Sequence, residues 1–71
     1  MNISKIVGEN LKNARKIKGL TQKQVAEVFF MTQQQYSRFE NGIFELGYQQ
    51  IIDICKFLEI TPNELFEFDN N

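Results

Sequence analysis

Apolar residues near the start of the chain recur at helical spacing. The positions before Thr21 are separated by steps of four and three: Ile3, Val7, Leu11 and Ala14. This spacing places them on one face of a helix, so we expect that face to be buried. Gly19 follows as a residue that commonly ends a helix, which predicts that the first helix stops there.

Three threonines mark the starts of further helices. Each is followed three residues later by Gln or Glu, in the pairs Thr21 and Gln24, Thr32 and Gln35, and Thr61 and Glu64. In such a capping box the threonine hydroxyl accepts from the third helical N–H, and the Gln or Glu side chain accepts from the threonine N–H. Pro62 occupies the first helical position after Thr61, where its missing N–H costs nothing.

These signals predict four more short helices. They run from Gln22 to about Phe29, from Gln33 to about Asn41, from Tyr48 to Leu58 and from Pro62 to about Phe66. Their inward positions are Val25, Ala26, Phe29, Tyr36, Phe39, Ile51, Ile54, Cys55 and Leu58. Gly42 is expected to end the helix that begins at Gln33. Because no run alternates as a strand would, we predict an all-α fold, a compact bundle of five short helices with a frayed polar tail at 69–71.

Composition narrows the possible classes of protein. A chain of 71 residues with 42% apolar residues is sufficient for one small domain, 1–71, and argues against disorder. One cysteine and no histidine give no disulfide, no zinc finger and no histidine-based triad, so we expect no enzyme, no metal and no cofactor. Charged residues Lys5, Glu9 and Lys12 interrupt any secretory leader, and no apolar run is long enough for a membrane span. We therefore expect a cytoplasmic protein with no membrane partner.

The net charge of −1 conceals an uneven distribution. Residues 1–42 carry seven basic and three acidic side chains, a net +4, whereas residues 43–71 carry one basic and six acidic side chains, a net −5. Such asymmetry indicates a basic face that meets a polyanion, with a chance segregation of charge as the alternative.

The second and third predicted helices are separated by only about three residues, 30–32. A connection this short makes the helices cross steeply, which is the geometry of a helix-turn-helix unit. The second helix of that unit projects its N-terminal residues into the DNA major groove.

Glutamines and an arginine stand at that position. Gln33, Gln34 and Gln35 open the helix, and Arg38 follows one turn later. Glutamine matches the donor and acceptor pair of adenine, and arginine matches the two acceptors of guanine. With two aromatic residues facing inward, the outward side carries Gln33, Gln34, Ser37 and Arg38. The alternative is a solvated helical face without a ligand.

An ordered set of residues across 7–66 resembles the Cro/repressor-type helix-turn-helix family, also called the xenobiotic-response-element family. The matching stretches are Leu11 with Arg15, Gly19-Leu20-Thr21-Gln22, Val25-Ala26, Thr32-Gln33-Gln34, Ser37-Arg38 with Phe39-Glu40-Asn41-Gly42, and Leu58 with Ile60 and Glu64-Leu65-Phe66. The Thr-Gln-Gln opening and the Glu-Asn-Gly ending are most similar to the DNA-binding domains of lambdoid phage repressors.

The resemblance implies roles for residues that contact DNA. Gln33 would read a base, most readily adenine, and Gln34 and Arg38 would contact neighbouring base edges. Gln22 would bond a phosphate and brace Gln33. Backbone contacts would come from Lys23, Ser37 and Asn41, with the N–H groups near Asn41 to Phe44 holding phosphate.

The resemblance also implies an architectural ion pair between Arg15 and Glu40, with Arg15 also near a phosphate.

Three departures from the family pattern stand out. Phe30 replaces the usual turn glycine, which predicts either a differently shaped turn or a Phe30 that packs on a partner. Leu46-Gly47 replaces the usual Pro-Ser, and Tyr36 replaces an aliphatic residue, so that its hydroxyl is expected to point toward the DNA backbone.

The acidic end is rich in phenylalanine, and the resemblance to the repressors implies that this end forms a contact between two copies of the chain. Candidates for this dimer contact are Phe44, Leu65, Phe66 and Phe68. A monomer whose phenylalanines cover its own core, and a regulator docked at this end, are the alternatives.

The predicted function is a sequence-specific, double-stranded DNA-binding transcriptional regulator. We expect a small dimeric repressor of prophage, mobile-element or restriction-modification-controller type on a palindromic operator, with no small-molecule ligand. The alternative is a protein-interaction module, antitoxin-like or an antagonist subunit, that has weak or no DNA binding.

Overall fold

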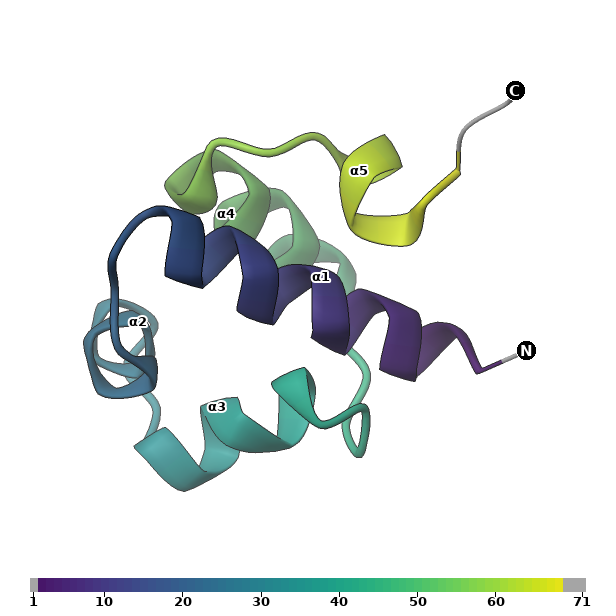
Figure 1. The fold of residues 1–71 in the computed structure, drawn as a ribbon. Coiled ribbons are helices and arrows are strands. Elements are labelled where there is room, and N and C mark those ends of the chain that lie inside the picture. Colours follow the sequence, from purple (N-terminus) through teal and green to yellow (C-terminus); the bar gives the residue numbers. More distant parts are fainter. Residues whose placement is uncertain (1, 69–71) are drawn as a thin grey trace.

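Five α-helices make up most of residues 2–68, the part of the chain that the computed structural model describes (Figure 1). They are α1 (Ile3–Ile17), α2 (Gln22–Val28), α3 (Gln33–Glu40), α4 (Tyr48–Leu58) and α5 (Pro62–Phe66). The predicted all-α fold is confirmed, with helix ends within a residue or so of those expected. The tail at 69–71 lies outside the described residues.

The three threonine capping boxes are present at the starts of α2, α3 and α5. At α3, the hydroxyl of Thr32 accepts from the N–H of Gln35 at 3.1 Å, and the Gln35 side chain accepts from the N–H of Thr32 at 2.9 Å. Gly47, at the start of α4, has only the second half of this arrangement, because it lacks a side chain: its N–H donates to Gln50 Oε1 at 2.7 Å. Local sequence therefore defines where the helices begin.

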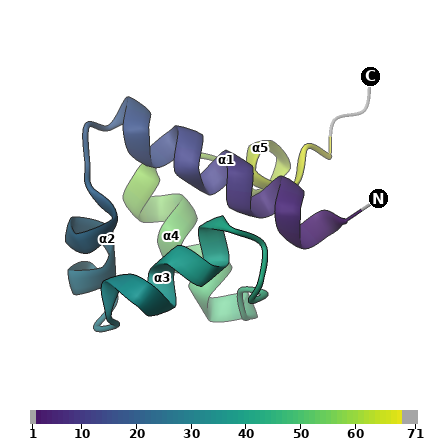
Figure 2. The ribbon, with the colours of Figure 1, turned by 60° about the horizontal axis from the view of Figure 1, so that its bottom comes forward.

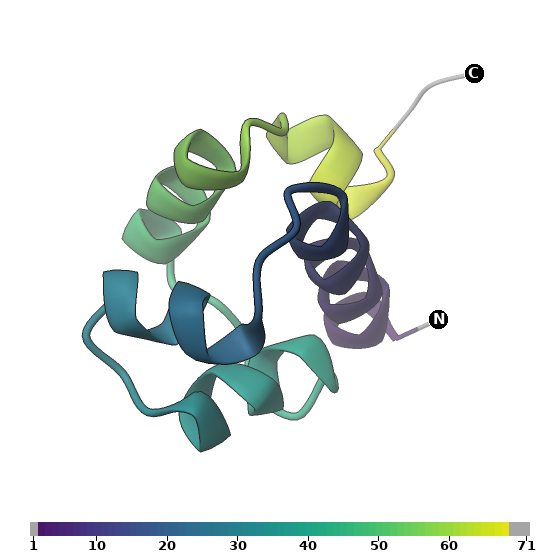
Figure 3. The same cartoon turned by 60° about the vertical axis from the view of Figure 1, so that its left-hand side comes forward.

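The helices surround a central apolar core. Figure 3 shows how the helices are arranged around this centre, with α1 viewed nearly end-on. Its members are Val7, Leu11, Ala14, Val25, Ala26, Tyr36, Phe39, Ile54, Cys55, Leu58 and Leu65. Phe29 and Ile51 pack against it while only partly buried. The prediction that Ile3 lies on the buried face of the first helix is wrong. Its side chain is 59% exposed, because that end of α1 extends past the core.

Close contact between α1 and α3 depends on two glycines. A Cβ at Gly8 would lie 2.4 Å from the carbonyl oxygen of Glu40, so only glycine allows the backbones to approach this far. Gly42 has a φ of +75°, and a Cβ there would lie 2.9 Å from the Cα of Lys5. The C-terminal end of α3 is therefore held directly against α1.

Phe30 adopts the left-handed backbone conformation that usually requires glycine. Its φ is +56°, and its side chain is 97% exposed. The turn is closed by the N–H of Met31, which donates to the carbonyl of Ala26 at 3.0 Å. The turn therefore keeps the shape that a glycine would give it, at a cost of about 1 to 2 kcal/mol for the L side chain.

None of the helices within residues 2–68 is long and apolar enough to cross a membrane. The same residues contain no group of three or more His, Cys, Asp or Glu side chains placed to hold a metal ion.

Candidate nucleic-acid interface

The α2–α3 pair forms one outer edge of the molecule. In Figure 1, α2 is seen nearly end-on while α3 is seen from the side along the lower edge, so the two helices cross steeply. Figure 2 shows the same pair from below, where no other helix covers α3. The residues that face outward from α3 are therefore open to a large ligand.

Most of the residues expected to contact DNA gather on this edge. A shallow, largely polar hollow is lined by Gln22, Gln33, Gln34, Ser37, Arg38, Asn41 and Ile43. Gln33, Gln34 and Arg38 are exposed, and Ser37 is partly buried. Lys23 is exposed on α2 but does not line the hollow. We refer to these seven lining residues as the α3 face.

Ile43 is a member of the α3 face that the sequence did not indicate. Its side chain is 66% exposed, just after the end of α3. An isoleucine in a loop carries no base-matching chemistry, so only its position in the folded chain reveals it.

A chain of hydrogen bonds connects the core to the α3 face. Arg15 Nε lies 2.6 Å from Glu40 Oε2, and Arg15 Nη2 lies 3.1 Å from Glu40 Oε1. Gln22 Nε2 donates to Glu40 Oε1 at 2.9 Å, and Gln33 Nε2 donates to Gln22 Oε1 at 3.5 Å. The ion pair between Arg15 and Glu40 therefore holds Gln22, which in turn orients Gln33.

The electrostatics of this chain favour the charged pair. Burial disfavours the carboxylate of Glu40, but hydrogen bonds from Arg15 and Gln22 outweigh it, so the pKa of Glu40 lies below its usual value. The hydrogen bond to Glu40 raises the pKa of Arg15, against the effect of burial. Arg15 also donates through Nη1 to the carbonyl of Leu20 at 2.8 Å, which ties the α1–α2 connection to the same pair.

The backbone N–H groups that follow α3 are not available to bind phosphate as predicted. The N–H groups of Asn41, Gly42, Ile43 and Phe44 all donate to carbonyls of α3, at 2.8 to 3.2 Å. The expectation that they hold phosphate is therefore wrong, because these bonds already close the C-terminal end of the helix. Asn41 still offers its exposed side chain, whose Nδ2 lies 3.3 Å from Ser37 Oγ.

The Tyr36 hydroxyl does not point toward a DNA backbone. The residue is only 1% exposed, and its hydroxyl is buried without a hydrogen-bond partner among the described residues. Burial, followed by the nearby Glu40 carboxylate, raises the pKa of Tyr36. The earlier expectation is wrong because the side chain is part of the core.

The four candidate dimer residues do not form one exposed set. Leu65 is fully buried, so it is a core residue and cannot contact a partner from this position. Phe44, Phe66 and Phe68 are 42%, 37% and 76% exposed. Phe44 also stacks under the guanidinium of Arg38, whose Cζ is 5.5 Å from the ring centroid.

Two capped helices that cross steeply through residues 29–32, with an exposed polar face on the second, define a helix-turn-helix unit. Residues 8–67 match the family model described as a helix-turn-helix domain, and the chain belongs to this family. A relative in Bacillus subtilis (strain 168), "Uncharacterized HTH-type transcriptional regulator YqaE", is 35% identical over 63 residues, which cover 89% of this chain and 54% of the relative. The chain thus spans about half the length of that relative. No solved structure gives a significant match.

Proposed function

We propose that this chain is a sequence-specific DNA-binding transcriptional regulator in which α3 enters the major groove. The observation that carries the proposal is the exposure of Gln33, Gln34 and Arg38 along one uncovered face of the second helix. Their side chains match the hydrogen-bonding edges of adenine and guanine. The name of the B. subtilis relative, which describes a transcriptional regulator, supports the regulatory role.

The polar residues of the α3 face, together with Lys23 on α2, receive roles from their positions. Gln33 reads a base while Gln22 holds it from behind, because the two side chains are already in contact. Gln34 and Arg38 read the neighbouring bases. Lys23, Ser37 and Asn41 contact the sugar-phosphate backbone, which positions the helix without reading sequence.

We further propose a Cro/repressor-type protein that acts as a dimer on a palindromic operator. An apolar surface next to the C-terminal end of α3 offers the contact. One hollow there is lined by Ile3, Phe44, Leu46, Tyr48, Ile51 and Phe66. Tyr48 is 90% exposed, and Phe68, which follows Phe66 in the sequence, is also exposed. In a dimer of this kind, the two α3 helices would bind half-sites about 34 Å apart. Occupancy of such an operator would repress transcription, as expected for a prophage, mobile-element or restriction-modification controller.

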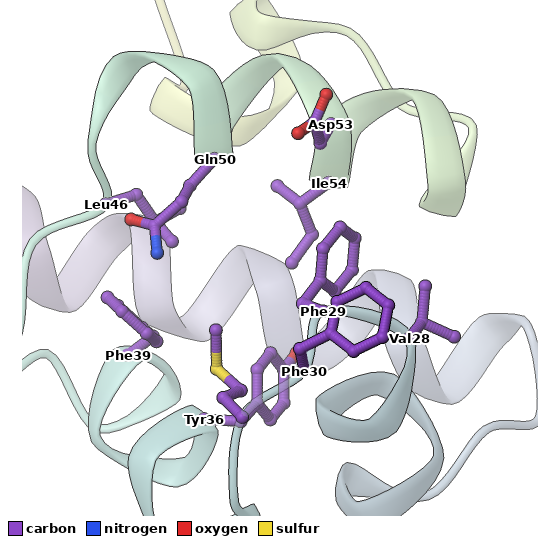
Figure 4. Close-up of a pocket in the computed structure, with 10 residues that line it drawn as sticks. Val28, Phe29, Phe30, Tyr36, Phe39, Leu46, Gln50, Asp53 and Ile54 are labelled. Carbon is purple, nitrogen blue, oxygen red and sulfur yellow. The ribbon is translucent and has the colours of Figure 1, made fainter.

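A protein-interaction module is the second candidate, and one feature favours it. The turn residue Phe30 is 97% exposed beside a groove of about 340 Å³ between the α2–α3 turn and α4 (Figure 4). Apolar residues Val28, Met31 and Ile54 line it, with Gln50 and Asp53 at α4. An exposed ring beside an apolar groove is typical of a contact with another protein. The base-matching set on α3 favours DNA as the principal ligand.

Selection from a pool of random duplex DNA tests the proposal. The purified protein is expected to enrich a palindromic motif whose half-sites are one helical turn apart. A matched chain with Gln33→Ala, Gln34→Ala and Arg38→Ala keeps the helix and removes the reading groups, and it should enrich nothing. Enrichment of no motif by the unchanged protein would contradict DNA reading and leave the interaction module as the better assignment.

Sedimentation tests the dimer separately. A mass that rises from one chain to two at micromolar concentration is expected. Phe66→Ser, which replaces an exposed ring on the apolar surface, should return the protein to a single chain. A single-chain mass at every concentration, with and without the operator, would contradict the dimer.

A further inference from the structure

The ring of Phe44 touches two consecutive residues of α3. The Arg38 guanidinium lies over it, with Cζ 5.5 Å from the ring centroid. The ring of Phe39 meets it edge-on, with centroids 5.9 Å apart and an interplanar angle of 69°. Phe39 is buried and Arg38 is exposed on the α3 face. Phe44 therefore connects the core to one of the residues that read DNA.

The backbone holds Phe44 in this place. The carbonyl of Arg38 accepts from the N–H of Ile43 at 2.8 Å and from that of Phe44 at 3.2 Å. The left-handed φ of +75° at Gly42 turns the chain back toward α3, which makes both bonds possible. The ring is therefore fixed relative to Arg38 by local structure, without any need for bound DNA.

Stacking of this kind restrains an arginine while leaving its donors free. A guanidinium that lies over a ring uses its face, and its five N–H groups point outward in its own plane. An unrestrained arginine loses much rotational freedom when it binds a base. Neither ion pair found within residues 2–68 involves Arg38, so its charge is not neutralised by a carboxylate there.

We propose that Phe44 is a positioning residue that orders Arg38 for base reading. This inference rests on the proposed function, in which α3 reads base edges. It also gives Phe44 a role distinct from the dimer contact expected from the sequence. Phe44 is also 42% exposed and lines the hollow with Ile3 and Tyr48, so the two roles must be separated by experiment.

The test measures base discrimination at single positions of the duplex that the wild-type protein selects. The Arg38→Ala variant first identifies the base pair that Arg38 reads, as the position where its preference disappears. The ratio of Kd values for the wrong and right base at that position is then measured for Phe44→Leu and Phe44→Met, which lack the ring. Phe44→Tyr keeps the ring, and Phe30→Leu removes another exposed ring, which lies in the α2–α3 turn before the start of α3.

Loss of the stacking contact should reduce discrimination at the Arg38 position by about 2- to 5-fold in the two variants without the ring, the range expected for an exposed cation–π contact. Discrimination at the position read by Gln33 should stay unchanged. Phe44→Tyr should restore the wild-type ratio, and Phe30→Leu should not alter it. In an Arg38→Ala background, Phe44→Leu should have no further effect at that position.

Two outcomes would overturn the inference alone. One is an unchanged ratio at the Arg38 position in both ringless variants. The other is an equal loss at every position, because a dimer contact or a purely structural role weakens binding to all sequences alike. If the wild-type protein selects no sequence, the proposed function is wrong and this inference is wrong with it, so the two failures are distinguishable.

Discussion

Glu40→Gln is the perturbation that tests the hydrogen-bond chain behind the α3 face most directly. The substitution keeps the size of the side chain and removes its charge. The Glu40 side chain is 1% exposed and that of Arg15 is 9% exposed, so the change leaves a guanidinium buried without its counter-ion. Breaking a buried pair in this way costs about 3 to 5 kcal/mol. A domain of 71 residues is stable by only about 4 to 10 kcal/mol, so the loss is a large share of the total.

The effect should depend on pH in a defined direction. Because the pKa of Glu40 is lowered on folding, the carboxylate stabilises the fold fully above its unfolded pKa of about 4.3. That contribution is lost as the pH falls through the lower, folded pKa. The glutamine variant has no such group. The difference in free energy of unfolding between the two proteins should therefore be largest near pH 7 and shrink below about pH 4.

Urea unfolding followed by circular dichroism from pH 7 to pH 3 measures this difference. Glu27→Gln is the matched control, since it removes the same charge from an exposed position on α2 and should change stability by less than about 0.5 kcal/mol. A loss of under about 1 kcal/mol for Glu40→Gln at pH 7 would refute the reasoning. So would a difference that stays constant across the pH range.

Four further outcomes are expected. Gly8→Ala should lower the free energy of unfolding by about 1 to 3 kcal/mol, because its Cβ would meet a backbone carbonyl oxygen of α3 at 2.4 Å. The control Asn13→Ala, at an exposed position of α1, should leave stability unchanged, and equal urea midpoints for the two variants would contradict the prediction. Phe30→Gly should raise stability by about 1 kcal/mol by relieving a left-handed residue that packs little, and a lower melting temperature would count against strain there. Gln33→Ala should cost about 1 to 3 kcal/mol of specific DNA binding and relax preference at one base pair, so an unchanged preference would remove α3 as the reading helix. Lys23→Ala should weaken binding to all sequences alike and reduce the salt slope by about one, whereas an unchanged slope would place Lys23 away from phosphate.

Local signals predicted the helices well because each start depends on a few neighbouring residues. Thr21, Thr32 and Thr61 form their capping boxes with residues three positions away, so no long-range information is needed. The outward face of α3 followed from helical periodicity in the same way. Resemblance to a known family supplied the pairing of Arg15 with Glu40, which are 25 positions apart.

What the sequence did not predict depends on how distant elements meet. Leu65 was expected at a dimer contact, but its burial comes from the packing of α5 on the core. The Tyr36 hydroxyl was expected near DNA because the residue replaces an aliphatic one in the family pattern, but the whole side chain is buried in the core. The amides of 41–44 were expected to bind phosphate, and only the turn geometry shows that they already have acceptors.

Contact between α1 and α5 joins parts of the chain that are far apart in sequence. The Asn10 side chain donates from Nδ2 to the carbonyl of Leu65 at 2.9 Å, across 55 positions, while Leu65 itself fills the core. Such a contact closes a loop almost as long as the domain. Because closing a long loop costs chain entropy, we expect this contact to form late in folding. During synthesis, the face of α1 that packs against α5 should therefore stay exposed until α5 has left the ribosome. Folding should then occur in one cooperative step, and a nascent chain arrested before Leu65 should be sensitive to protease.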